Sequence, residues 1–195
     1  MNKRRYYTDP KTGISSYAIF SEDERHRYVL DRHFLHGVGN ITFIMLNPST
    51  ADEMKDDPTV RRCIGLAQRE FMARCFIRNI YAYRATDPHD LWAAQKALGS
   101  LYVQGPDNRL AITDAIERSH KVITAWGNHA IAPAWLYELM MKRPDSVYHL
   151  GLTQQQQPRH PLYVPKDVVL TPWSSSAPPH PSPTSVGAVT SSQGV

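Results

Sequence analysis

Two short motifs in the sequence place a polar side chain directly before a proline. Asn47-Pro48 follows an apolar run, and His160-Pro161 lies in a proline-flanked loop. Because proline holds the preceding residue extended, the Asn47 amide would project in a fixed direction over the edge of a sheet. The His160 imidazole could donate a hydrogen bond or positive charge to a developing anion. An ordinary turn and a solvated loop histidine are the alternatives at these positions.

Charged and aromatic side chains follow other strand-like segments. Arg84 and Asp87 bracket a loop, where they could clamp a phosphate or form a structural ion pair. Tyr81, Tyr83 and Trp126 offer rings on which a nucleobase could stack, although each could equally pack in the core. These residues extend the candidate site beyond the two proline motifs.

Other kinds of site find little support in the sequence. Asp52, Asp56 and Asp57 form an acidic cluster, but Asp57 is explained as a helix cap and no histidine is spaced to join them. Cys63 and Cys75 cannot form a disulfide framework or a four-ligand zinc site on their own. The sequence has no phosphate-cradling glycine loop, nucleophile elbow or zinc signature. We therefore expect no metal and no cofactor, and kinases, dinucleotide oxidoreductases and serine hydrolases are disfavoured.

Strand-like and helical segments alternate along the chain and would bring the candidate residues together. Strands are expected at residues 41–46, 75–81, 121–125 and 146–150, and helices at 90–98, at 106–119, and from Pro58 and Asn128 onward. This alternation predicts an α/β fold, a three-layer α/β/α sandwich with a mainly parallel central sheet. Ligands bind at the carboxyl ends of such strands, so residues 47–52, 83–87, 126–129 and 159–163 should meet there.

The chain of 195 residues fits one domain with additions at both ends. We expect a single α/β domain at residues 1–170, with a hairpin-like extension over about residues 1–38 built from segments 16–20 and 27–34. Residues 171–195 contain five prolines, seven serines and no charged residue, which predicts a disordered tail that is dispensable for folding.

Charge and hydropathy indicate which partners and which cellular location to expect. The net charge of +4 permits contact with nucleic acid without establishing it, because basic residues are scattered among acidic ones. The longest apolar run, residues 41–46, is far shorter than a membrane helix, and the first twenty residues contain no apolar core of signal-peptide length. We therefore expect a cytoplasmic protein that does not enter the membrane; its oligomeric state is left open.

Several motifs resemble the family called domain of unknown function 1643 (DUF1643), which is found in bacteria and phages. The resemblance covers about residues 25–170. It is carried by Met45–Asp52, Asp57–Thr59, Tyr83–Pro88, Gly105–Asn108, Trp126-Gly127 and His160–Tyr163. The family name implies no activity.

A more distant resemblance, to the uracil-DNA glycosylase superfamily, does imply chemistry and the fold of that superfamily. It lies in the order of Asn47-Pro48, Asn79, Trp126–Ala130 and His160-Pro161. By this resemblance Asn47 handles the attacking water, Asn79 reads the base, and His160 stabilises the departing base. The loop containing Tyr163 corresponds to one that enters the duplex. Together with the residues singled out above, the candidate site has Asn47 and His160 as catalytic residues, and substrate is expected to be bound by Pro48, Ser49, Asn79, Tyr81, Tyr83, Arg84, Asp87, Trp126 and Tyr163.

These observations favour a protein that acts on a nucleobase or nucleotide, most concretely a hydrolase of an N-glycosidic bond in DNA. Cleavage of that bond passes through a cation-like sugar, which requires a placed water on one face and help for an anionic base on the other. A binding module that recognises a modified base or nucleotide without cleaving it is the alternative. A small-molecule hydrolase unrelated to nucleic acid is the third.

Overall fold

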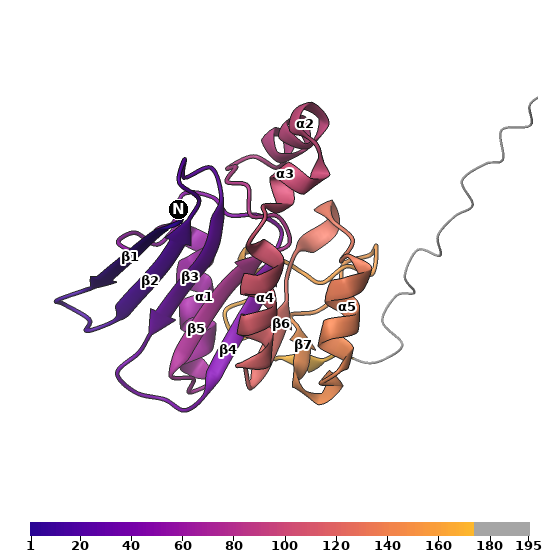
Figure 1. Cartoon of the computed structure of the whole chain (residues 1–195). Coiled ribbons are helices and arrows are strands. Elements are labelled where there is room, and N and C mark those ends of the chain that lie inside the picture. Colours follow the sequence, from indigo (N-terminus) through magenta and orange to yellow (C-terminus); the bar gives the residue numbers. More distant parts are fainter. Residues whose placement is uncertain (174–195) are drawn as a thin grey trace, which may run out of the picture.

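The computed structural model describes residues 1–173, through which one continuous sheet runs (Figure 1). Its strands are β1 (Lys3–Thr8), β2 (Ser15–Phe20), β3 (Arg27–His33), β4 (Asn40–Met45), β5 (Arg74–Asn79), β6 (Lys121–Thr124), β7 (Val147–His149) and β8 (Thr171–Pro172). Their order across the sheet is β1-β2-β3-β5-β4-β6-β7-β8. The strands β5, β4, β6 and β7 pair in parallel, and all other neighbours pair antiparallel. The sheet is therefore mixed, with a parallel centre and antiparallel edges.

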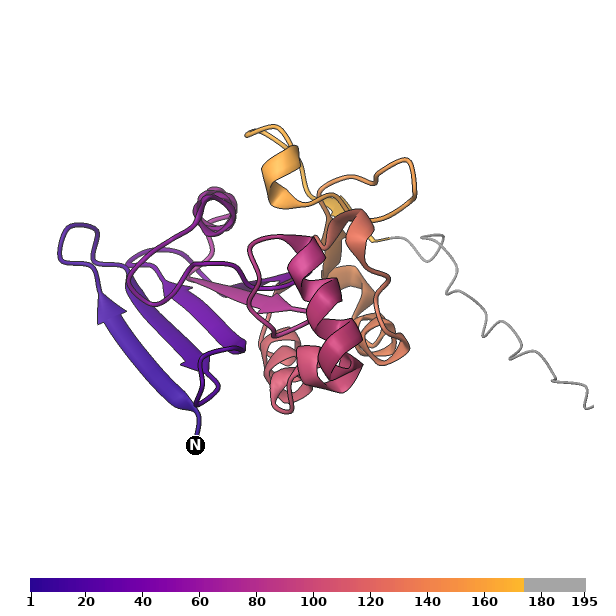
Figure 2. The same cartoon turned by 90° about the horizontal axis from the view of Figure 1, so that it is seen from above.

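Helices cover both faces of the parallel centre (Figure 2). They are α1 (Pro58–Arg69), α2 (Pro88–Leu98), α3 (Ser100–Gln104), α4 (Asn108–Glu117) and α5 (Ala134–Met141), with short 3-10 turns at Gly127–His129, Pro144–Ser146 and Pro161–Tyr163. On β4, Phe43 packs into the cluster under α1, whereas its neighbour Ile44 packs into the cluster under α4 and α5. This alternation is what a strand buried on both faces requires.

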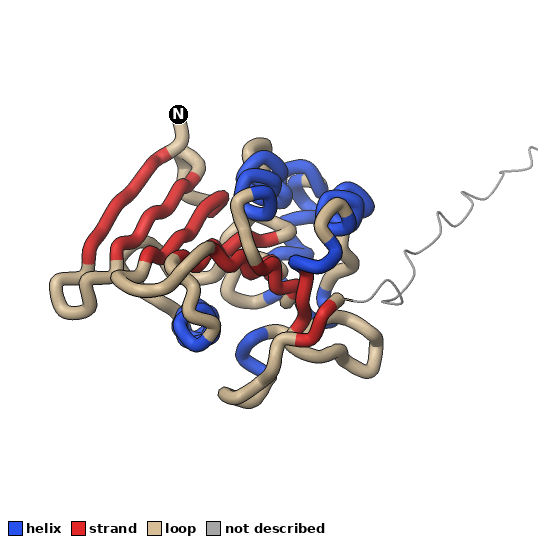
Figure 3. Tube along the Cα trace, turned by 90° about the horizontal axis from the view of Figure 1, so that it is seen from below, coloured by secondary structure: helices blue, strands red, loops and turns tan. Residues whose placement is uncertain are grey.

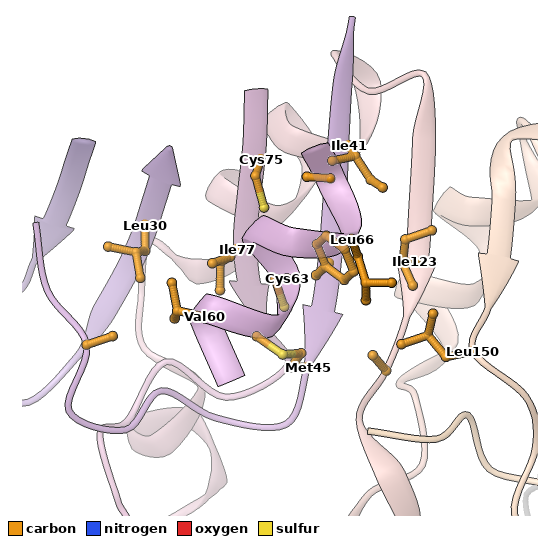
Figure 4. Close-up of a cluster of buried hydrophobic side chains, with 14 of the residues drawn as sticks. Leu30, Ile41, Met45, Val60, Cys63, Leu66, Cys75, Ile77, Ile123 and Leu150 are labelled. Carbon is orange, nitrogen blue, oxygen red and sulfur yellow. The ribbon is translucent and has the colours of Figure 1, made fainter. Parts of the chain in front are cut away.

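Helix α1 begins where the sequence predicted it. The carboxylate of Asp57 accepts the Val60 N–H at 2.8 Å, and Pro58 occupies the first turn, where no N–H is needed. Figure 4 shows Val60, Cys63 and Leu66 of α1 pointing onto the sheet, and all three are buried. The packing of this face holds the start of α1 against the carboxyl end of β4.

The three N-terminal strands form an antiparallel meander at the end of the sheet farthest from β8 (Figure 3). The expected hairpin corresponds to β2 and β3, and β1 adds a third strand. Two ion pairs attach the meander to the rest of the fold: Arg78 of β5 bonds buried Asp31 of β3 at 2.7 Å, and buried Arg32 of β3 bonds the partly exposed Asp56 at 2.5 Å. The N-terminal extension is thus part of the sheet.

The structure confirms a mixed α/β protein but corrects three finer predictions. Within residues 1–173 only three of the seven strand pairings are parallel, because the meander and β8 add antiparallel edges that strand–helix alternation does not reveal. Asn128 does not cap a helix, since it lies in a 3-10 turn and α5 starts after Pro133. The fold continues past residue 170, where Thr171 pairs with His149 and Trp173 is buried.

The remainder of the predicted tail, residues 174–195, lies outside the described residues. In residues 1–173 no helix combines the length and apolar character needed to cross a membrane.

Candidate functional site

A cavity of about 840 Å³ lies at the carboxyl ends of β4 and β6. Its walls come from the loop after β4, the first turn of α1, the segment after β6 and the loop over residues 153–163. Three of these segments carry residues predicted for the site, namely Asn47 and Ser49, then Trp126, and finally His160 and Tyr163. Residues far apart in the sequence therefore meet where an open α/β sheet usually binds its ligand.

The amide of Asn47 is held by backbone carbonyl groups. Its Nδ2 donates to the carbonyl oxygen of Ala85 at 2.8 Å and to that of Pro48 at 3.1 Å. Ala85 in turn donates its N–H to the Pro48 carbonyl at 2.9 Å. With both amide protons engaged, Oδ1 has no donor among the described residues and is the atom left to accept a hydrogen bond from a ligand or water.

His160 is neutral near pH 7. Burial lowers the pKa of its imidazole to about 4, while the nearby charge of Asp57 opposes the change and His129 adds to it. Its Nδ1 accepts the Leu162 N–H at 3.4 Å, so the neutral ring carries its proton on Nε2. The side chain can therefore donate a hydrogen bond to a ligand, but at neutral pH it does not supply a positive charge.

Two aromatic residues, Trp126 and Tyr163, also line the cavity. Trp126 is 3% exposed, and its indole N–H donates to Gln157 Oε1 at 3.1 Å. Tyr163 is 77% exposed and lies 5.7 Å from the His160 ring, measured between centroids. The cavity wall thus includes a largely buried ring, which also packs in the core, and an exposed ring beside His160; aromatic rings of this kind can contact a planar ligand.

Two charged residues that were not predicted for the site line the cavity. Asp57, which the sequence predicted as a helix cap, is that cap and also lines the cavity. Arg27 of β3 lies in the wall although its side chain is only 3% exposed, and it donates to the Ala51 carbonyl at 2.8 Å. Its second guanidinium nitrogen reaches Asn79 Oδ1 at 3.4 Å. The cavity therefore contains both a carboxylate and a buried cation.

Other predicted residues lie outside this cavity. Tyr83 and Arg84 line a neighbouring, more open hollow, which shares Ser49 with the main cavity. Tyr81 packs edge-on against Trp92 at 5.4 Å. These side chains contribute to packing and to the second hollow.

Three more positions have local structural roles. Asp87 caps α2 by accepting the His89 N–H at 2.8 Å, as a loop carboxylate before a proline often does. Pro48 contributes its carbonyl to the Asn47 contact. Asn79 is 2% exposed and sits behind the cavity wall, against Arg27.

Each carboxylate of the acidic cluster has its own protein partner. Asp52 accepts the backbone N–H groups of Met54 and Lys55, Asp56 pairs with Arg32, and Asp57 caps α1. The cluster is thus explained by local structure.

Comparison with known proteins identifies the family. The sequence profile of the family described as protein of unknown function (DUF1643) matches residues 27–162, which is more than half of the chain. The chain therefore belongs to this family, as its motifs predicted. No curated protein and no solved structure matches it. The resemblance to the uracil-DNA glycosylase superfamily finds no support in these comparisons.

Proposed function

We propose that the protein hydrolyses the N-glycosidic bond of a nucleotide, most concretely one in DNA, within this cavity. The observation that carries the proposal is the meeting of Asn47, Trp126 and His160, from three separate segments, in one cavity wall. They supply the functions that the reaction needs, which are a group to orient water, a ring to stack on and a donor for the departing base.

In the proposed reaction Asn47 Oδ1 accepts a hydrogen bond from water. The water oxygen bonds to C1′ of the sugar as the bond from C1′ to the base nitrogen breaks, and the bonding electrons leave with the base. His160 Nε2–H donates a hydrogen bond to the negative charge that develops there. The proton lost by the water ends on the base, so the products are a neutral base and a sugar with a hydroxyl at C1′.

The fold is in keeping with this proposal. A parallel centre of β5, β4, β6 and β7, with helices packed on both faces, supports the three-layer arrangement expected of a uracil-DNA-glycosylase-like domain. The antiparallel strands β1, β2, β3 and β8 would be additions to that arrangement.

A binding module is the second candidate, and one observation favours it. Asn47 is a neutral amide, and the depressed pKa of His160 leaves that side chain neutral as well. The one carboxylate in the described cavity wall, Asp57, already accepts the Val60 N–H. A cavity without a free strong base suits recognition of a nucleotide at least as well as slow hydrolysis.

Base release from defined substrates tests the proposal. Nucleotides, single strands and duplexes carrying uracil, hypoxanthine or phage-type modified bases are incubated with the protein, and free base is measured by mass spectrometry. Release that is lost in Asn47→Ala supports the enzyme, whereas tight binding without release supports the module.

The matched control for Asn47→Ala is Asn40→Ala. Asn40 is the first residue of β4, whereas Asn47 follows the other end of that strand. The Asn40 side-chain amide donates to the Arg118 carbonyl at 2.7 Å, so the variant loses a similar hydrogen bond away from the cavity. We expect Asn40→Ala to release base at the wild-type rate.

A further inference from the structure

Three arginine side chains are buried in residues 1–173, and one of them has no carboxylate partner. Arg32 pairs with Asp56 at 2.5 Å and Arg78 with Asp31 at 2.7 Å. Arg27 is buried to the same degree, yet no described carboxylate lies within 4.0 Å of its guanidinium group. Buried charges in proteins are normally paired, so Arg27 is the exception that requires an explanation.

The surroundings of Arg27 offer neutral acceptors but little negative charge. Its protein contacts are the Ala51 carbonyl and Asn79 Oδ1. Burial lowers the pKa of Arg27 to about 9, and the attraction of Asp57 compensates only in part. The Asn79 Nδ2 group beside it is also buried and has no hydrogen-bond partner. A buried cation and a buried donor thus lie together without an anion.

Arg27 and Trp126 line the cavity from different parts of the sheet. Both line it, but Arg27 belongs to β3 and Trp126 follows β6, with β5 and β4 between them. Three strand spacings correspond to about 14 Å. The first turn of α1 lines the wall, and the positive end of its dipole adds to the potential of Arg27. A ligand with an aromatic ring at one end and an anion at the other fits this arrangement.

We propose that Arg27 anchors an anion subsite for the terminal phosphate of a nucleotide whose base lies beside Trp126. This inference rests on the proposed nucleotide-acting function and specifies its substrate. The Arg27 side chain is 3% exposed, so only the end of a ligand would contact it. A terminal phosphate meets this requirement. An internal phosphodiester does not, because the nucleotides on both sides of it would have to enter the cavity wall. The substrate is then a free nucleotide or the phosphorylated end of a strand.

Calorimetric titration tests the subsite on the full chain. Uridine, cytidine, adenosine and guanosine are compared with their 5′-monophosphates, and inorganic phosphate is added as a competitor. A charge-assisted contact to a buried arginine predicts that at least one monophosphate binds about tenfold or more tightly than its nucleoside. Inorganic phosphate should weaken that binding. Equal affinities of every pair, or no competition, would overturn the proposal.

Matched variants locate the effect. Arg27→Met and Arg159→Met each remove one positive charge from the cavity wall, but Arg159 is exposed. We expect the preference for the phosphate to disappear in Arg27→Met and to persist in Arg159→Met. A preference that survives in Arg27→Met contradicts the assignment. If Arg27→Met does not fold, Arg27→Lys is measured in its place. The displaced charge of the lysine should reduce the preference for the phosphate, and an unchanged preference would overturn the proposed subsite.

Oligonucleotides distinguish the two sources of a terminal phosphate. A short single strand with a 5′-phosphate is compared with the same strand ending in a 5′-hydroxyl. Preference for the phosphorylated strand would identify strand ends as the ligand. Binding of monophosphates but of neither strand would identify free nucleotides as the ligand. Both results support the subsite. Phosphate-dependent binding without release of base would contradict the proposed function and leave the subsite intact. Equal release of base with and without the phosphate would contradict the subsite and leave the proposed function intact.

Discussion

The side-chain amide of Asn47 donates to the carbonyl oxygen of Ala85 at 2.8 Å, which joins the loop after β4 to the loop that follows β5. A second bond, from the Ala85 N–H to the Pro48 carbonyl, runs in the opposite direction at 2.9 Å. The two loops are thereby fixed to each other at the cavity. The orientation of Asn47 Oδ1 follows from backbone contacts alone.

Asn47→Asp should destabilise the protein more than Asn47→Ala does. The aspartate would place a carboxylate oxygen against the carbonyl oxygens of Ala85 and Pro48, which now accept from the amide. An unsatisfied contact of this kind costs about 1–3 kcal/mol. Urea denaturation at pH 7 measures the free energy of unfolding of both variants. An aspartate variant as stable as the alanine variant would show that the amide is not held in this way.

The pKa of His160 predicts a specific loss of stability in acid. Because the folded-state pKa of about 4 lies below the ordinary value of 6.5, the unfolded chain binds a proton between these pH values and the folded protein does not. The contribution is therefore fully present above pH 6.5 and is lost as the pH falls toward 4. Stability measured across this range should decline more steeply for the wild type than for His160→Gln. Parallel declines would contradict the depressed pKa.

The buried arginines should respond differently to replacement by methionine. Arg78→Met leaves Asp31 buried without its partner and should cost about 3–5 kcal/mol of unfolding free energy. Arg27→Met leaves no carboxylate unpaired and should change stability by less than about 1 kcal/mol. Urea denaturation compares the two variants. A large loss in Arg27→Met would indicate that Arg27 serves folding more than ligand binding.

Trp173 should be part of the stable fold although it follows the predicted end of the domain. It is 7% exposed, its ring lies 6.1 Å from that of Trp126, and its backbone N–H donates to the Val147 carbonyl at 2.8 Å. Trp173→Ala should lose about 3 kcal/mol, while Trp173→Phe, which keeps most of the apolar contact, should lose less than about 1 kcal/mol. Thermal unfolding of the two variants checks this order, and equal melting temperatures would contradict it.

Much of the parallel centre of the fold could be predicted from the sequence. The apolar run at residues 41–46 is long enough to define a strand buried on both faces, and Asp57-Pro58 marks a helix start by local chemistry. The edges of the sheet could not be predicted in the same way. Whether Ser15–Phe20 continues a central sheet or stands apart depends on long-range pairs such as Arg78 with Asp31.

The cavity was partly predictable for a related reason. Asn47, Trp126 and His160 follow strands or precede prolines, so their residue types and positions indicate a site at the edge of the sheet. Arg27 lies within an otherwise strand-like segment, where a basic residue is easily assigned to an exposed face. The available signal was the presence of three charged residues in Arg27–His33, a segment that also contains Tyr28, Val29 and Leu30. A strand buried on both faces must pair such charges, so an arginine there is a candidate for a buried contact.

The direct test of the proposed chemistry is the effect of His160→Ala on catalysis and binding with the substrate that releases base. A donor to the departing base acts only as charge develops, so the single-turnover rate should fall roughly a hundredfold, equivalent to ~3 kcal/mol. The dissociation constant of the substrate should change little. Both quantities are measured on the same folded variant. A rate within about twofold of the wild type would remove His160 from the mechanism and contradict the proposed hydrolysis.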